Sequence, residues 1–242
     1  MDKVMKRYLD KINAQGQYTE FPGVTVIANA SKSDSAFWSK IHNVLNSNLV
    51  SSYFAPLPPK SYHMTAMDLY TEMADGGDNW GKFITERLSA FRKLYTVLEE
   101  NKIYPQIKLK AIRTSSVIQL QVEIPQEQRA TIEAIAESFN IAHKIPKEMH
   151  ITLAYQYKLV AGADGEKLKK YLEEEIQRLF DEYPSITLDA PQLSYFKNME
   201  KFVPWDAKKN PFTPKRFTLF QCFSTTDEED NEASEESQLK LN

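Results

Sequence analysis

Two stretches of the chain carry the same short pattern, LPPKSYHMTAMDLY at residues 57–70 and IPKEMHITLAYQYK at residues 145–158. In each, a turn containing proline and lysine leads into a run with strand composition, and the run carries His-x-Thr. On a strand, residues i and i+2 point to the same face. We therefore expect the imidazole and the hydroxyl of each motif to project together, while Met64 and Ile151 point the other way into apolar packing.

The chemistry of these two motifs suits the cleavage of a phosphodiester. Two such strands side by side would bring His63, His150, Thr65 and Thr152 into one groove. One neutral imidazole can take a proton from water or a sugar hydroxyl, and a protonated one can give a proton to the leaving oxygen. The threonine hydroxyls can donate to the non-bridging phosphate oxygens. This scheme requires no metal ion and no cofactor.

A single His-x-Thr is weak evidence, because a histidine on a strand is more often a structural residue with its hydrogen bonds satisfied. Two copies on two strands, each after a similar turn, strengthen the case for a functional pair, but on this pattern alone both interpretations stay open.

The remaining pattern indicates a mixed chain with several helices and strands. Apolar spacing predicts helices over residues 1–16, 37–49, 80–101, 125–140 and 166–183. Further strands are predicted over 24–28, 107–112, 117–124, 185–188 and 216–223. From Asp227 to Glu236 the chain carries seven acidic side chains, so residues 226–242 are expected to form an acidic disordered tail beside a single domain over 1–225.

Composition excludes several classes of protein. The 242 residues are 42% hydrophobic, which is typical of a globular chain. A net charge of −3 argues against duplex DNA as a partner. The one cysteine, Cys222, permits neither an intrachain disulfide nor a cysteine metal cluster. No apolar run is long enough to cross a membrane and the N-terminus lacks a signal-peptide core, so we expect a cytoplasmic monomer.

At these residues the sequence resembles the two-histidine (2H) phosphoesterase superfamily, which includes LigT-like RNA phosphodiesterases and cyclic nucleotide phosphodiesterases. The paired signature His-x-[Thr/Ser]-x is matched by HMTA at 63–66 and HITL at 150–153. The segments YLDKINAQG, FPGVTVIANA and LPPKSYHMTAMDLY look like a bacterial and eukaryotic branch of that superfamily. The resemblance extends over residues 8–223.

The resemblance implies a bilobal α+β fold in which two antiparallel sheets face a central groove, with helices outside and a pseudo-twofold axis. It also implies that His63 and His150 are the acid/base pair and that Thr65 and Thr152 bind the substrate phosphate. Similar proteins act on 2′,3′-cyclic phosphates, 2′,5′ linkages, ADP-ribose cyclic phosphate or cyclic oligonucleotides, so a nucleotide or RNA-end substrate is expected. Insertions at 71–81 and 191–215 depart from the compact family members and could narrow substrate choice.

Four further residues are candidate substrate contacts. Tyr62, Tyr155 and Tyr157 neighbour the motifs and could stack on a base, although strict alternation turns Tyr155 and Tyr157 away from His150 unless the strand bends. Core packing is the commoner role for such tyrosines. Arg113 could bind phosphate through its guanidinium.

Two other functions stay open at the level of sequence. The groove could be a binding module that holds a nucleotide or RNA end without turning it over, although binding alone does not need two groups of matched pKa. A metal hydrolase using the histidines is disfavoured, because no helical His-x-x-x-His pair or acidic partner at ligand spacing is present.

Overall fold

The computed structural model describes residues 10–160 and 162–213, and those up to Phe212 belong to one compact unit. Three predicted features therefore lie wholly or partly outside the described residues: the start of the first helix, the strand over 216–223 and the acidic tail over 226–242.

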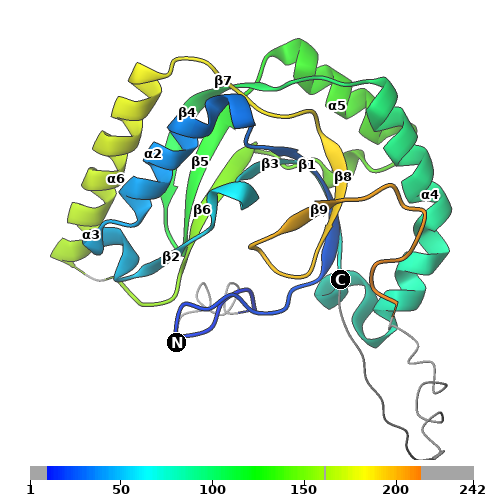
Figure 1. Ribbon diagram of the computed structural model, residues 1–242, viewed down its shortest axis with the longest axis horizontal. Helices are drawn as coiled ribbons and strands as arrows, with labels where there is room; N and C mark the ends of the chain where they lie inside the picture. The colour runs from blue at the N-terminus through cyan, green and yellow to red at the C-terminus, as the bar shows by residue number, and fades with distance from the viewer. Residues whose placement is uncertain (1–9, 161, 214–242) are drawn as a thin grey trace, which may run out of the picture. The chain divides into compact units, whose positions relative to one another are not determined.

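The centre of the fold is one curled sheet whose strand pairings are all antiparallel, in the order β7-β4-β5-β6-β3-β1-β8-β9, with β2 paired to β6 (Figure 1). The two strands that carry His-x-Thr, β3 and β6, are neighbours at its middle. The strands are β1 (Gly23–Asn29), β2 (Phe54–Pro56), β3 (His63–Thr71), β4 (Gln106–Thr114), β5 (Val117–Glu123), β6 (His150–Gln156), β7 (Ile186–Thr187), β8 (Gln192–Phe196) and β9 (Phe202–Pro204).

Helices cover the outer side of this sheet, with α2, α3 and α6 over one part and α4 and α5 over another (Figure 1). Each long helix buries one stripe of apolar side chains, as in α6, where Leu168, Leu172 and Ile176 recur every four residues. The helices are α2 (Ser35–Leu45), α3 (Asn48–Ser51), α4 (Trp80–Glu100), α5 (Gln126–Ser138) and α6 (Ala163–Glu182). Short turns of 3₁₀ helix are η1 (Lys32–Asp34), η2 (Pro59–Ser61), η4 (Gly77–Asn79) and η5 (Ala142–Lys144), and η3 (Glu72–Gly76) is a turn of π-helix. Among the described residues, no helix is both long and apolar enough to cross a membrane.

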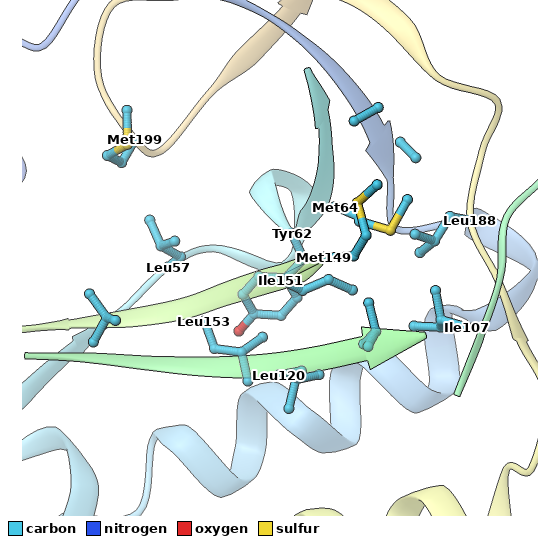
Figure 2. Close-up of a cluster of buried hydrophobic side chains, with 14 of the residues drawn as sticks. Leu57, Tyr62, Met64, Ile107, Leu120, Met149, Ile151, Leu153, Leu188 and Met199 are labelled. Atoms are coloured by element: carbon cyan, nitrogen blue, oxygen red, sulfur yellow. The ribbon is translucent and has the colours of Figure 1, made fainter. Parts of the chain in front are cut away.

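The middle residues of both motifs lie in the core between sheet and helices. Met64 and Ile151 are fully buried, and Figure 2 shows them in one cluster with Leu120, Leu153 and Met149. This confirms the prediction that the residue between histidine and threonine points into apolar packing. Burying side chains of this size contributes roughly 1.5–3 kcal/mol each, so the core fixes which way each motif faces.

The predicted α+β class with antiparallel strands is confirmed. The finer prediction of two separate sheets related by a pseudo-twofold axis is not confirmed, because hydrogen bonding between β3 and β6 joins the strands into one sheet. That junction is narrow, since Met64 and Ile151 are the paired residues there. The predicted helix over 1–16 is wrong for its described part: residues 10–16 form turns, and Ile12 bridges to Tyr18 as a short hairpin. In this arrangement Ile12 is buried in the core without a helix around it.

Candidate active site

A groove with a volume of about 920 Å³ lies on the face of the sheet opposite the core cluster. Both histidines and both threonines of the motifs line it. All four side chains are half-buried, so they are held by their surroundings and still reach the open space. The groove is where the prediction from strand alternation placed these side chains.

The register between β3 and β6 brings the two motifs together. Met64 is paired with Ile151 across antiparallel strands. Because residue numbers run in opposite directions on such a pair, His63 stands across from Thr152, and Thr65 stands across from His150. The two imidazoles therefore occupy one diagonal of a compact quartet and the two hydroxyls occupy the other.

Both imidazoles are anchored in the same way. The Nδ1 atom of His63 lies 2.7 Å from the carbonyl oxygen of Ser61, and Nδ1 of His150 lies 3.0 Å from the carbonyl oxygen of Glu148. A carbonyl oxygen only accepts hydrogen bonds, so each Nδ1 carries a proton and donates it. This leaves Nε2 of each ring as the nitrogen that can exchange a proton with a ligand.

The turns before the motifs supply these carbonyl groups. Pro59 begins the 3₁₀ turn η2, and Ser61 is held in it by a bond from its hydroxyl to the carbonyl oxygen of Pro58 at 2.8 Å. The turn containing Pro146 leads to Glu148, whose carboxylate pairs with Lys110 at 2.9 Å. The shared proline-and-lysine turns in the sequence thus precede a shared backbone acceptor two residues before each histidine.

The two histidines differ in their electrostatic surroundings. The Phe202 ring lies 4.1 Å from the His63 ring, measured between centroids, and the His63 anchor is partly buried, whereas the His150 anchor is exposed. Burial lowers the pKa of His63 to about 4, with smaller contributions in the same direction from His150 and Lys11, while the bond to Ser61 opposes the shift. His63 is therefore neutral at pH 7 in the free protein.

One threonine hydroxyl has its orientation set by a neighbour. The side-chain amide of Gln119 donates to Oγ1 of Thr152 at 3.1 Å. Because that bond occupies a lone pair of the oxygen, the hydroxyl proton is available to a ligand in the groove. Thr65 stands opposite Ile27, whose side chain offers no hydrogen bond. The bond from Gln119 therefore orients Thr152 in particular.

A β-bulge decides where Tyr155 points. Thr152 is paired with Gln119, but Ala154 is paired with the next residue, Ile118, so Leu153 is an extra residue in β6. One extra residue reverses the alternation beyond it, and Tyr155, although only 5% exposed, lines the groove together with Thr152.

The other three candidate contacts fall into two groups. Arg113 lines the groove. Tyr62 is fully buried on the opposite face, with its hydroxyl 3.1 Å from Nδ1 of His42, and Tyr157 donates to the carbonyl oxygen of Ser51 at 2.8 Å. Tyr62 and Tyr157 therefore serve in packing, and Tyr157 lies beyond the end of β6.

Several residues that line the groove were not among those predicted from the sequence. Gln119 and Gln121 alternate with apolar residues along β5, which predicts that both point to the same face of the sheet. That face could be identified as the groove only once β5 was known to lie beside β6. The aromatic residues beside His63 come from segments distant in sequence and carry no such signal: Phe21, Phe196 and Phe202. Within residues 10–160 and 162–213, no group of three or more His, Cys, Asp or Glu side chains is arranged as a metal site.

Comparison with known families agrees with this geometry. The family model 2H-phosphodiest, described as a domain of unknown function (DUF1868), matches residues 11–123. That match contains the first His-x-Thr motif, and the second lies on the strand paired to it. Over residues 11–123 the chain is therefore similar to the 2H phosphodiesterase family.

Two similar proteins match most of the length of this chain. It is 24% identical over 241 residues to uncharacterized protein 127L of Invertebrate iridescent virus 6, covering 84% of this chain and 97% of the viral protein. Its structure resembles that of ATU0111 from Agrobacterium tumefaciens, a conserved protein of unknown function, with a TM-score of 0.63 and 18% identity over 85% of this chain and 98% of the other. This second likeness shows a shared fold.

A weaker structural likeness is to Usb1 from Kluyveromyces marxianus, with a TM-score of 0.43 and 12% identity over 77% of this chain and 98% of Usb1.

Proposed function

We propose that this protein is a metal-independent phosphodiesterase that hydrolyses a cyclic or 2′-linked phosphodiester of a nucleotide or RNA end. The observation that carries the proposal is the anchoring of both imidazoles through Nδ1 within one groove. Each anchor presents Nε2 for proton transfer, and the register sets a threonine hydroxyl across from each ring. Similarity to the 2H phosphodiesterase family supports phosphodiester chemistry for such a quartet.

In this mechanism the two histidines have opposite roles, and the buried surroundings of His63 support its role as the base. His63 is neutral at pH 7, so its Nε2 accepts the proton from the attacking water. The water oxygen forms a bond to phosphorus as the bond from phosphorus to the leaving oxygen breaks. His150, as imidazolium, gives its Nε2 proton to that leaving oxygen. The proton gained by His63 and the proton lost by His150 are exchanged with solvent before the next turnover.

The threonines bind the phosphate through the reaction. Their hydroxyls donate to the two non-bridging oxygens, which carry negative charge in substrate and transition state alike. A groove of about 920 Å³ accommodates a nucleotide or the end of a single strand.

The alternative is a binding module that uses the same groove. Binding a phosphate needs hydroxyls and cations, and it does not need two imidazoles with the same tautomer anchored in the same way. The duplicated anchor therefore favours the enzyme. Tight binding of a nucleotide that is unaffected by neutral replacements of both histidines, without turnover, would favour the module.

The test is a panel of 2′,3′-cyclic nucleotides, 2′,5′-linked dinucleotides, ADP-ribose cyclic phosphate and cyclic dinucleotides, incubated with the full chain in excess chelator. Turnover of at least one member, absent from a parallel preparation of the His63→Ala, His150→Ala double variant, is the expected result. Activity that disappears in chelator and returns with a divalent ion would overturn the metal-independent mechanism. Equal activity in both preparations would identify a contaminant.

A further inference from the structure

The polar floor of the groove continues beyond the motif strands. Thr152 is paired with Gln119 on β5, and Gln119 is paired with Arg113 on β4. These three residues form one row across three strands, and all of them line the groove. In the adjacent row, His150 is paired with Gln121, which also lines the groove. The floor on this side of the quartet therefore holds two amides and ends at a guanidinium.

Arg113 lies at a distance that a second group of the same ligand can span. Neighbouring strands are about 4.8 Å apart, so the backbone of Arg113 stands roughly 10 Å from that of Thr152. The long side chain of arginine covers part of this distance. A phosphate in the quartet and a second phosphate on the same nucleoside can therefore be held by Thr152 and Arg113 together.

The charges around Arg113 leave it available to an anion. Arg113 is exposed, and within residues 10–160 and 162–213 its guanidinium forms neither a hydrogen bond nor an ion pair. The carboxylate at this end of the groove, Glu148, is already paired with Lys110 at 2.9 Å. Lys147, which directly precedes Glu148, is also exposed and lines the groove. Arginine binds phosphate through two parallel N–H bonds, which makes such a site specific for geometry as well as charge.

The opposite side of the quartet has a different character. Beside His63 the walls are aromatic, with the ring centroids of Phe202 and Phe196 5.0 Å apart. The cation on this side, Lys11, lies over the ring of Phe21 at 4.7 Å. A flat apolar base suits this wall, while a second phosphate suits the Arg113 side.

We propose that Arg113 and the adjacent β5 amides form a second phosphate subsite, so that the preferred ligand is a nucleoside carrying a phosphate at each end of its sugar. The nucleoside's terminal phosphate lies in the histidine–threonine quartet, its base lies on the Phe202 side, and its 5′-phosphate lies on Arg113. This substrate class rests on the proposed function, in that the quartet must hold the reacting phosphate. Both a nucleoside bisphosphate and the last nucleotide of an RNA strand present this chemistry.

The test measures binding by calorimetry, because binding does not depend on turnover. The full chain is titrated with adenosine 3′-monophosphate, with adenosine 3′,5′-bisphosphate and with the dinucleotide ApAp that ends in a 3′-phosphate. Each ligand is tested with the wild type, Arg113→Gln and Arg113→Lys. The matched control is Lys108→Gln, which removes one positive charge from the same strand at an exposed position that does not line the groove.

We expect the bisphosphate to bind the wild type about 10- to 100-fold more tightly than the monophosphate, as charge-assisted hydrogen bonds allow. Arg113→Gln should remove this advantage and leave the monophosphate affinity within about twofold, Arg113→Lys should keep part of it, and Lys108→Gln should keep all of it. An advantage shared by ApAp assigns the subsite to an RNA end, and one confined to the bisphosphate assigns it to a mononucleotide.

Equal affinities for one and two phosphates, or an advantage that survives Arg113→Gln, would overturn the subsite. The outcome is separable from that of the proposed function. A subsite that binds as expected in a protein with no turnover would mean a binding module. Turnover of a cyclic nucleotide, together with equal affinities for one and two phosphates, would mean an enzyme lacking the subsite.

Discussion

Met64 and Ile151 face each other across β3 and β6, fully buried on the core side of the sheet. This pair fixes the active face, because it turns His63 and Thr65 on one strand, and His150 and Thr152 on the other, into the groove. The proposed chemistry therefore depends on an apolar contact that lies on the opposite face of the sheet from the groove.

Shortening Ile151 should test that dependence. Ile151→Ala removes buried methyl groups and is expected to reduce the free energy of unfolding by about 2–5 kcal/mol, and Ile151→Val by about 0.5–1.5 kcal/mol. Denaturant unfolding measures both. Well below the unfolding transition, the valine variant should keep wild-type turnover. A valine variant of normal stability but greatly reduced turnover would mean that the pairing has a role beyond orientation.

The bond from Gln119 to Thr152 should contribute to kcat. Gln119→Leu removes the amide that orients the hydroxyl, and we expect kcat to fall by about 10-fold, in line with the loss of one oriented donor to a phosphate. Thr152→Val should have a comparable or larger effect, and Thr152→Ser, which keeps the hydroxyl, should restore most of the activity. Equal kcat for the wild type and both disruptive variants would contradict this role.

The aromatic wall should set the acid limb of the pH–rate profile. The acid limb of kcat/KM reports the pKa of the base in the free enzyme, and for His63 that pKa is about 4. Phe202→Ala exposes the imidazole of His63 to water and should raise the pKa of His63 toward 6.5. The acid limb then moves to higher pH by about one unit or more.

The control for this shift is Phe139→Ala, at a half-buried aromatic position that does not line the groove, and its acid limb should coincide with that of the wild type. An acid limb unchanged in Phe202→Ala would indicate that His63 is not the base.

The same histidine should make the fold sensitive to acid. Its pKa is about 4 in the folded state against 6.5 for the ordinary side chain, so between these values the unfolded chain binds more protons. Stability should therefore fall as the pH drops from about 6.5 to 4, by at most about 1.4 kcal/mol per pH unit from this group. His42, whose pKa burial also lowers, acts in the same direction.

His63→Gln should flatten this dependence without abolishing it, because His42 remains. Unfolding free energies of the two proteins measured at several pH values between 4 and 7.5 provide the comparison. Parallel curves would show that His63 does not lose a proton on folding.

The sequence predicts the site well where strand periodicity alone decides it. His63, Thr65, His150 and Thr152 share a face because i and i+2 do so on any strand, and the apolar Met64 and Ile151 identify the other face. The resemblance to the superfamily supplied the pairing of the two strands, which periodicity cannot give.

Features that depend on tertiary hydrogen bonding could not be predicted in this way. The bulge at Leu153 that turns Tyr155 into the groove arises from the pairing with β5, not from β6 itself. Phe202 belongs to a three-residue strand in a stretch rich in turns, so its position beside His63 follows only from how β8 and β9 fold back. Ile12 fits a helical pattern, but its burial is reached through a bridge to Tyr18.

In the proposed mechanism, His63 and His150 act as base and acid on one phosphodiester. The most direct measurement compares kcat/KM for the wild type, His63→Ala and His150→Ala on two substrates: a nucleotide with a sugar leaving group, chosen from the panel, and a nucleoside p-nitrophenyl phosphodiester whose leaving group departs without a proton. Both variants should lose about 10²–10⁴-fold on the first substrate. On the second, His150→Ala should recover most of its loss and His63→Ala should not. A folded variant of either histidine that keeps wild-type kcat/KM on the sugar-linked substrate would contradict the two-histidine mechanism.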